Sequence, residues 1–328
     1  MKHSWRRKDL FKLVSAFASI YTIWCTTYLG IRISVDTNPP FFMAAARFLI
    51  AGSVTFLLLR VRGRPLPNRV HWRSAVIIGA FLLVGGNGLV TWSEQQIPSS
   101  TAALVVATVP LWIALFDWLL FRGARPGKQV TMGLLLGFGG IALLLGPGQI
   151  LGTTDFSLSA LLILLLAPVL WSLGSLYVRQ APLPEDIFMT TAMEMLAGGF
   201  LLLLAGLLTG EAARLNLASI SAASLIALLY LTLFGSFVAL SAYAWLLKHA
   251  EPAKVATYTY VNPVIAVFLG WLILSETITP TMLLAVSIIV LAVILITTHK
   301  SKRKPAAGNY YEEQHPAATS SELGSRAP

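Results

Sequence analysis

The sequence predicts an all-α integral membrane protein with ten transmembrane helices in two inverted repeats of five helices. Hydrophobic residues make up 56% of the chain and charged residues only 12%, whereas about 25% of the residues in an average soluble domain are charged. The charges lie between repeated apolar runs of about 20 residues, the length that crosses a bilayer as a helix. Two corresponding runs carry a proline near their middle, which suggests a duplicated chain with a broken or bent helix in each half.

Ten ranges of the chain have the length and apolarity of a spanning helix. They are 11–31, 41–60, 74–92, 101–121, 129–146, 157–178, 188–208, 222–246, 254–274 and 280–298. The basic segment 1–12 leads into an apolar stretch that continues to about Ile31. This stretch is too long for a cleavable signal, so we expect it to remain as the first helix. Residues 301–328 are polar and without periodicity, which is typical of a disordered tail.

Basic residues lie on alternate sides of the expected helices. Most of the 24 Lys and Arg residues are in the N-terminal segment, in every second loop and at the start of the tail. The other loops hold only Arg32 and Arg214, and they carry acidic residues such as Glu211 and Glu276. Because positively charged loops remain in the cytoplasm, we expect both termini to be cytoplasmic. The excess of positive charge therefore indicates topology rather than binding to nucleic acid.

The second half of the chain repeats the rarer residues of the first half in the same order. The matched pairs are Trp24 with Trp171, Arg32 with Arg179, Phe41 with Phe188 and Gly52 with Gly199 at an offset of 147 positions, and Trp92 with Trp245, Pro110 with Pro263 and Trp118 with Trp271 at an offset of 153. Each repeat holds five helices, and an odd number makes the second repeat enter the membrane from the opposite side. We therefore expect domains at 1–152 and 153–300, related by a pseudo-two-fold axis in the membrane plane, and a cytoplasmic tail at 301–328.

Motifs of enzymes and metal sites are missing from the sequence. There is no zinc-protease, serine-hydrolase or phosphate-binding-loop motif, so we expect neither catalysis nor ATP hydrolysis from this chain. The five histidines fall in loops, tails or helix ends and suggest no metal cluster. A single cysteine, Cys25, permits no internal disulfide. We therefore expect no enzyme activity, no cofactor and no metal.

Three ionisable residues fall inside the expected spans: Arg47, Asp117 and Glu194. A charge at membrane depth costs about 2.5–3.5 kcal/mol on insertion scales and needs a partner or water. Arg47 and Glu194 occupy equivalent positions of the two repeats. They either form a fixed anchoring pair, or Arg47 is satisfied by nearby backbone carbonyls, or each faces a cavity and one or both respond to substrate or protons. Asp117 is expected to reach the cytoplasmic basic loop, and Glu94 to be a solvated loop end, with sensing of cations or protons as its alternative.

Short segments along the chain form a pattern through their order and spacing. They are Ile23-Trp24 through Gly30, Pro39-Pro40-Phe41, Arg47-Phe48, Ala51-Gly52, Ile97-Pro98-Ser99 before Pro110, and Asn262-Pro263 with Gly270 and Leu274-Ser275-Glu276. In these segments, across about residues 10–298, the chain resembles the EamA-type transporters of the drug/metabolite transporter superfamily. The resemblance implies ten helices in two inverted halves and export of small metabolites by alternating access. It also implies a central cavity, walled mainly by the helices at 74–92, 101–121, 222–246 and 254–274.

The expected substrate site consists of polar and aromatic residues near the two prolines. Those on the last of these helices are Tyr258, Thr259, Tyr260 and Asn262, and those on the other three are Asn87, Trp92, Thr108, Trp112 and Tyr243. Pro263 frees the carbonyl of Thr259 from its helical hydrogen bond. Aromatic walls with few hydrogen-bonding groups suit a weakly polar small molecule. The alternative is that these side chains bond across helices or anchor the protein at the membrane interface.

These observations and the resemblance together predict a secondary active transporter of the inner, cytoplasmic membrane. We expect it to export amino acids, related small metabolites or drugs by rocking of its two halves, with Pro110 and Pro263 as hinges. A passive channel and a membrane-bound lipid-handling enzyme are the alternatives. The expected partners are a small-molecule substrate and the lipid bilayer, with no nucleic acid, and the chain is expected to be a monomer or else a homodimer. The first repeat has Arg122-Gly123 where the second has Ser275-Glu276, so a structural capping role is expected for Glu276.

Overall fold

A computed structural model describes residues 7–121, 123, 125–145, 157–249 and 258–298 of the chain. Within these ranges the regular structure is helical, and no strand is present. The helices of the first half are α1 (Arg7–Ser34), α2 (Pro40–Val61), α3 (Arg69–Gly79), η1 (Ala80–Gly88), α4 (Leu89–Ser93), α5 (Ser99–Val106), α6 (Val109–Leu119) and α7 (Lys128–Leu145). Those of the second half are α9 (Leu158–Val178), α10 (Ile187–Leu208), α11 (Glu211–Arg214), η2 (Leu217–Ser219), α12 (Ala222–Tyr230), η3 (Leu231–Val238), α13 (Ala239–His249), α15 (Tyr258–Leu274) and α16 (Pro280–Thr297).

Each of the ten expected ranges contains helix within the described residues. In this part of the chain, eight helical runs are long and apolar enough to cross a membrane, and the runs at 128–143 and 261–274 are shorter apolar helices. Three expected helices are divided. The range 74–92 contains α3, η1 and α4, the range 101–121 contains α5 and α6, and the range 222–246 contains α12, η3 and α13.

A π-helix interrupts the equivalent helix in both halves. η1 precedes α4 in the first half, and η3 precedes α13 in the second. The wider turn of a π-helix changes the direction of the residues that follow, and such segments are frequent at functional sites. No pattern in the sequence predicts this interruption. Both segments consist mainly of apolar residues and so resemble the rest of the expected helix.

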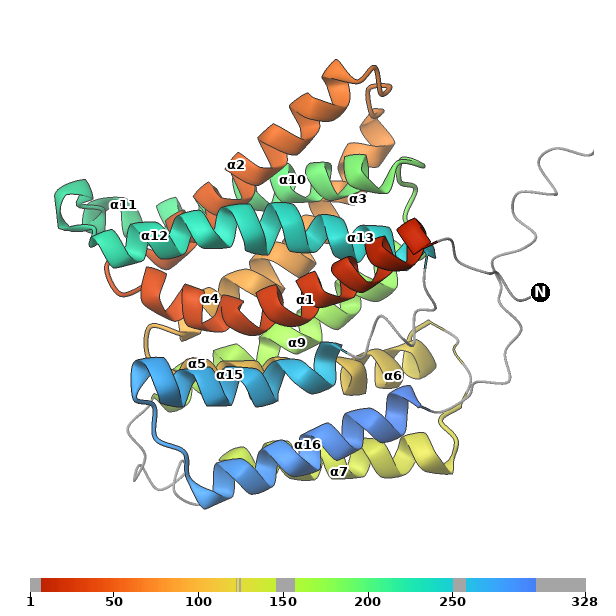
Figure 1. Ribbon diagram of the computed structural model, residues 1–328, viewed down its shortest axis with the longest axis vertical. Coiled ribbons are helices and arrows are strands. Elements are labelled where there is room, and N and C mark those ends of the chain that lie inside the picture. Colours follow the sequence, from red (N-terminus) through yellow and green to blue (C-terminus); the bar gives the residue numbers. More distant parts are fainter. Residues whose placement is uncertain (1–6, 122, 124, 146–156, 250–257, 299–328) are drawn as a thin grey trace, which may run out of the picture. The chain divides into compact units, whose positions relative to one another are not determined.

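The helices α2 and α10 pack against each other (Figure 1), and a reciprocal pair of glycines lies at their contact. A Cβ atom at Gly52 would lie 3.0 Å from the backbone nitrogen of Leu196, and a Cβ atom at Gly199 would lie 3.1 Å from that of Leu49. The two glycines and the two leucines are matched pairs at the offset of 147 positions. Each helix therefore makes the same contact with the other, and the missing side chains let the backbones approach closely.

The other helix contacts also occur in matched pairs. α1 packs against α13 and α15, while its counterpart α9 packs against η1 and α6. α7 packs against its own counterpart α16, as Figure 1 shows. For these helices, replacing each one by its counterpart in the other half gives contacts that the structure also contains.

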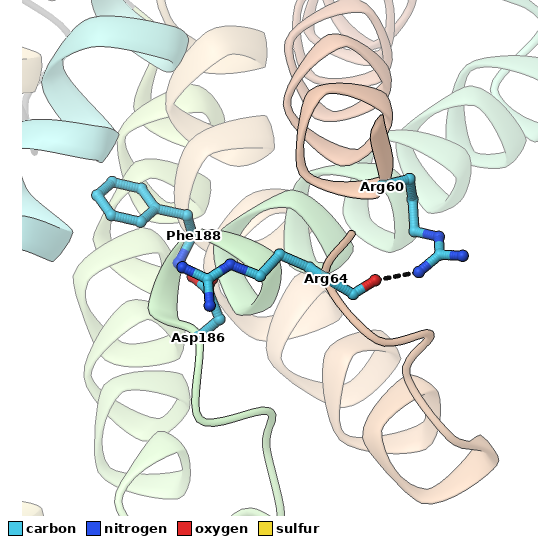
Figure 2. Close-up of polar contacts among 4 residues, drawn as sticks. All are labelled: Arg60, Arg64, Asp186 and Phe188. Atoms are coloured by element: carbon cyan, nitrogen blue, oxygen red, sulfur yellow. Dashed lines mark hydrogen bonds and ion pairs between the residues drawn. The ribbon is translucent and has the colours of Figure 1, made fainter. Parts of the chain in front are cut away.

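A polar contact joins the end of α2 to the start of α10 (Figure 2). Asp186 caps α10, since its Oδ1 accepts a hydrogen bond of 3.0 Å from the backbone N–H of Phe188. Arg64 Nε lies 3.0 Å from Asp186 Oδ2, and Arg60 donates to the carbonyl of Arg64. The Arg64 side chain is largely exposed. Such an ion pair stabilises the fold by less than about 1 kcal/mol, so its main effect is to orient the connection.

Candidate functional site

A cavity of about 120 Å³ lies among helices from both halves of the chain. Its wall is formed by α1, α2, η1, α4, α5, α6, α9, η3, α13 and α15. The wall is mostly apolar, and its polar side chains are Trp24, Thr27, Tyr28, Arg47, Asn87, Trp171, Tyr258 and Asn262. An apolar wall with a few polar groups is the usual character of a small-molecule site.

Aromatic rings of α1 and α15 line one side of this cavity, and a ring of α13 packs against both of them. The ring of Trp24 on α1 lies 4.8 Å, centroid to centroid, from that of Tyr258 on α15, and 5.0 Å from that of Tyr243 on α13. Tyr243 does not line the cavity, but its ring packs edge-on against Tyr258 at 6.1 Å. Edge-to-face and tilted pairs of this kind are favourable. Tyr243 therefore holds Tyr258 in position instead of contacting the cavity itself.

The predicted residues Asn87, Tyr258 and Asn262 all line the cavity. Asn262 is only 7% exposed, and its Oδ1 accepts a hydrogen bond of 2.9 Å from Cys25 Sγ on α1. The backbone carbonyl of Asn87 accepts a hydrogen bond of 2.8 Å from Thr91 Oγ1. Asn262 on α15 and Asn87 on η1 belong to different halves, so polar groups reach the cavity from both.

Arg47 also lines the cavity, and Glu194 does not. The Arg47 guanidinium donates from Nε to Ser236 Oγ at 2.7 Å and lies 4.7 Å from the ring centroid of Phe48. Among the described residues, no ion pair joins Arg47 to Glu194. The backbone carbonyl of Glu194 instead faces Gly79 of α3. A Cβ added at Gly79 would lie 3.2 Å from this carbonyl oxygen. The anchoring pair is therefore not present in the described structure.

Three further predicted residues lie away from the cavity. Trp92 packs among apolar side chains, and Trp112 packs on Phe138 of α7 with ring centroids 5.1 Å apart. Thr108 is fully buried, and its Oγ1 donates to the carbonyl of Val105 at 2.6 Å. These three side chains therefore make packing contacts or a local hydrogen bond, and their place in the substrate site stays a prediction. The side chain of Thr259 lies outside the described part of the chain.

The two predicted hinge prolines have different surroundings. Pro110 lies in the first turn of α6, directly after the interruption at 107–108 that separates α6 from α5. Proline is well tolerated at this position because its missing N–H has no helical partner there. Pro263 lies inside α15, which continues through it to Leu274. A broken helix is thus present at the first proline, and an uninterrupted one at the second.

Asp117 has a different partner from the basic loop that follows α6. Its Oδ1 lies 3.3 Å from Arg179 Nη1, and the Arg179 side chain is largely exposed. Since Arg179 follows α9, this exposed ion pair joins the two halves. Within the described residues there is no group of His, Cys, Asp and Glu side chains that could hold a metal ion.

Glu276 clamps the N-terminus of α5 from the other half of the chain. Its Oε1 accepts from the backbone N–H and the hydroxyl of Ser99, each at 2.7 Å, and its Oε2 accepts from the N–H of Ser100 at 3.1 Å and from the hydroxyl of Ser100. A carboxylate is favoured there because the first N–H groups of a helix lack partners and carry partial positive charge. The capping role expected for Glu276 is confirmed, and the capped helix belongs to the first half.

The end of α15 aims Glu276 at this position. Ser275 has a positive φ of 54°, and the N–H of Glu276 donates to the carbonyl of Gly270 at 3.1 Å. This is the reversal that ends many helices, usually with glycine in the left-handed position. Any Cβ at Gly270 would collide with the Glu276 carboxylate, so a glycine is required at that position. A second carboxylate, Glu211, caps α2 through the N–H groups of Phe41 and Phe42 at 3.0 and 2.9 Å.

Glu94 is fully buried, contrary to the expected solvated loop end. Neither of its carboxylate oxygens has a hydrogen-bond partner in the described structure. Arg32 lies nearby, but it donates to the backbone carbonyls of Glu94 and Gln95 at 2.6 and 3.1 Å. Burial and, after it, the charge of Glu276 raise the pKa of Glu94 well above its ordinary value, although Arg32 lowers it. The expectation was wrong because α5 and α9 cover the end of α4.

A second, more polar hollow of about 700 Å³ lies at the same helix ends. Its lining includes the charged residues Arg32, Asp36 and Glu276. The segment that contains Glu94 contacts both spaces. Val90, before Glu94, lines the cavity, and Gln95, after it, lines this hollow. The buried segment around Glu94 and the clamped start of α5 therefore separate the two spaces.

Sequence reasoning missed the contribution of α1 and α9 to the cavity. Trp24, Tyr28 and Trp171 line it, and a Cβ at Gly86 would lie 2.6 Å from the ring of Trp171. The resemblance had assigned the wall mainly to four other helices. A usable signal was present, because Trp24 and Trp171 are a matched pair of the duplication.

The sequence profile of the EamA-like transporter family matches residues 11–146 and 158–298. The chain belongs to this family. The EamA-like chain is also 39% identical over 286 residues to the uncharacterized inner membrane transporter YedA of Escherichia coli K12, covering 87% of this chain and 90% of YedA. It is therefore a multi-pass membrane protein from a family of transporters.

More distant relatives share most of the length of this EamA-like chain. The WAT1-related protein At3g02690, chloroplastic, of Arabidopsis thaliana is 28% identical, covering 82% of this chain and 66% of that protein. The uncharacterized transporter YoaV of Bacillus subtilis is 23% identical, covering 85% of this chain and 94% of YoaV. One solved structure, named only as a crystal structure of a protein, has a TM-score of 0.60 and 22% identity, and covers 88% of this chain and 97% of its own. This last likeness shows the fold.

Proposed function

We propose that the protein is a secondary active transporter that exports amino acids, related small metabolites or drugs across the inner membrane. The observation that supports this proposal is the cavity of about 120 Å³, whose walls come from both halves of the chain. In transporters built from repeats, the substrate lies at such an interface between the repeats. Membership in the family supports transport in general, and the name of the YedA relative supports the inner membrane.

The ten helical runs form two inverted repeats in this proposal, at 1–152 and 153–300, with both termini in the cytoplasm. The reciprocal contacts of Gly52 and Gly199 support a two-fold relation between the repeats. The corresponding sets of helices that contact α1 and α9 support this relation independently. The alternation of basic loops supports the orientation. The tail at 301–328 lies outside the described residues and remains an expectation.

Alternating access would proceed by rocking of one half against the other. Opening toward the outer side has to separate α5 from the end of α15, and so it breaks the contacts of Glu276 with Ser99 and Ser100. The interruption before Pro110 provides a bending point in the same region. A gradient of ions or of substrate supplies the energy, and one chain is the transporting unit because its own two halves enclose the cavity.

Counterflow in liposomes tests this proposal. Purified protein is reconstituted, the liposomes are loaded with a mixture of unlabelled amino acids, and the uptake of each labelled amino acid is followed with time. We expect saturable, transient accumulation of at least one of them, reduced in Asn262→Ala and unchanged in Gly139→Ala, whose added methyl group meets open space.

Three outcomes would contradict the transporter. An ion current proportional to voltage indicates a channel, and turnover of lipid by the purified protein indicates an enzyme. The absence of counterflow for every amino acid and drug tried, with folded protein, also rejects it. Loading one side only and following efflux then decides the direction of transport.

A further inference from the structure

Arg47 brings a single positive charge to the wall of the cavity. It is 4% exposed, and among the described residues that line the cavity it is the one with a charge. Its Nε donates to Ser236 Oγ at 2.7 Å, whereas its buried Nη1 has no hydrogen-bond partner in the described part of the chain. A donor of this kind is costly to leave unpaired, since burial has removed its water.

The residues around Arg47 pack closely against its guanidinium, but none of those described forms an ion pair with it. The guanidinium lies 4.7 Å from the ring centroid of Phe48, and a Cβ at Gly235 of η3 would lie 3.3 Å from Nη2. The ion pairs of the described chain join Arg64 with Asp186 and Arg179 with Asp117. Glu194 does not reach the cavity. A buried cation without a counterion favours the entry of an anion.

We propose that the cavity binds a small organic molecule that carries one carboxylate, and that Arg47 is the group that binds this carboxylate. The planar guanidinium matches the two oxygens of a carboxylate better than any other side chain does. One positive charge balances one negative charge, so a monoanion is favoured over a phosphate dianion. This inference deepens the transport function proposed above and rests on it for its meaning in the cell, but the binding itself is measurable without transport.

The same lining argues against recognition of cationic amines. Among the described residues no Asp or Glu lines the cavity, so an ammonium group would enter beside Arg47 without an acidic partner from this part of the chain. The amine of an amino acid would be met by neutral groups such as Asn87, Asn262 and the Tyr258 phenol. The rings of Trp24 and Trp171 would contact the apolar part of the molecule. The carboxylate, and not the amine, is therefore the recognised group.

Binding of matched small probes to the detergent-solubilised full-length protein tests this inference. The probes share one branched skeleton: 4-methylpentanoate, its neutral amide 4-methylpentanamide, and 3-methylbutylamine. Intrinsic tryptophan fluorescence reports binding, because Trp24 and Trp171 line the cavity, and calorimetry confirms it. We expect the carboxylate to bind at least ten times more tightly than the amide or the amine in the unaltered protein.

Variants of Arg47 assign the effect to this residue. Arg47→Gln should weaken binding of 4-methylpentanoate about 10- to 100-fold, the loss typical of a hydrogen bond to a charged group, and Arg47→Lys should recover part of it. Arg60→Gln removes a charge from the same helix outside the cavity and should leave binding unchanged. Gel filtration checks that each variant is folded.

Each possible result decides for or against the proposal. Equal binding of the carboxylate and the amine, no binding of the carboxylate, or unchanged binding in folded Arg47→Gln overturns it. If Arg47→Gln does not fold, the comparison of the three probes on the unaltered protein and on Arg47→Lys gives the answer. Specific binding without counterflow would retain this site and reject the transporter, so the two proposals fail separately.

Discussion

Two buried charged side chains, Arg47 and Glu94, and the part-buried Glu276 illustrate how differently the protein satisfies charge at the scale of single residues. Glu276 accepts hydrogen bonds from both the backbone and the hydroxyls of Ser99 and Ser100. Arg47 makes one side-chain hydrogen bond, and the carboxylate of Glu94 makes none in the described structure. The difference follows from position, because only Glu276 faces the free N–H groups at the start of a helix.

The unaltered protein should lose stability as the pH rises, and Glu94→Gln should weaken this dependence on pH. Because the folded pKa of Glu94 is raised, the folded state holds a proton that the unfolded state releases near its ordinary pKa of about 4.3. The stability is therefore fully present below that value and declines as the pH rises toward the folded pKa, by up to about 1.4 kcal/mol per pH unit. Thermal unfolding in detergent between about pH 5 and 8 should show this decline in the unaltered protein and a weaker one in Glu94→Gln.

A nearby exposed carboxylate gives the control for Glu94. Asp36 lines the second hollow and is exposed, so Asp36→Asn should retain the decline with pH. Identical pH profiles for Glu94→Gln and the unaltered protein would mean that Glu94 is ionised and hydrated in solution.

Glu276→Gln should loosen the junction between α15 and α5. The amide keeps one oxygen acceptor but places its NH₂ group against the N–H and hydroxyl donors of Ser99 or Ser100. Loss of charge-assisted hydrogen bonds of this kind costs about 1.5–3 kcal/mol. Thermal unfolding measures the loss, and faster hydrogen exchange confined to the start of α5 would identify its place. An unchanged unfolding midpoint would contradict the clamp.

Packing at the scale of helices depends on where glycines meet backbone. A Cβ at Gly52 would lie 2.9 Å from Met195 Cβ and 3.0 Å from the backbone nitrogen of Leu196, neither of which can move alone. Gly139 of α7 has nothing within 4 Å of the same position. Two glycines in apolar helices thus have opposite roles, and only the packing distinguishes them.

Gly52→Ala and Gly139→Ala should therefore change stability in opposite ways. The first overpacks the contact between α2 and α10 and should cost about 1–3 kcal/mol. The second adds helix propensity without a clash and should be neutral or stabilise by up to about 1 kcal/mol. Thermal unfolding of the two variants in the same detergent gives the comparison, and a stable Gly52→Ala would contradict the close approach of the two helices.

The two prolines show that a residue type does not by itself decide the course of a helix. Pro110 follows an interruption that Thr108 helps to close through its hydroxyl. Pro263 removes the same backbone donor, yet α15 continues through it. A proline in a helix interior removes one hydrogen bond and kinks or breaks the helix unless its surroundings support the chain, and in α15 the helix continues.

The topology of the whole molecule is testable with two single-cysteine variants. Cys25→Ser first removes the native thiol. Leu217, which is 75% exposed beyond α11, and Arg62, at the end of α2, are then each replaced by cysteine. A membrane-impermeant maleimide should label Leu217→Cys in intact spheroplasts and Arg62→Cys only after the membrane is opened. Labelling of both in intact spheroplasts would contradict the proposed orientation.

At the scale of the whole molecule, the helices followed from the sequence more completely than the site did. Long apolar runs can only be helices in a bilayer, because every backbone N–H and C=O must find a partner within the segment. The candidate site was found in part, through Asn87, Tyr258 and Asn262. Trp112 was assigned to the same site but faces Phe138, since a helix that is apolar all round does not reveal which of its faces turns inward.

The sequence by itself determined the helical class, the positions of the apolar helices and the order of matched residues in the two halves. Only the tertiary structure decided that Arg47 reaches the cavity without Glu194, that Glu94 is buried, and that Glu276 caps a helix of the other half. The physical reason is the distance along the chain over which each property is decided. Length and apolarity are properties of a segment, whereas the partner of a charge depends on the rotation and packing of helices far apart in the chain.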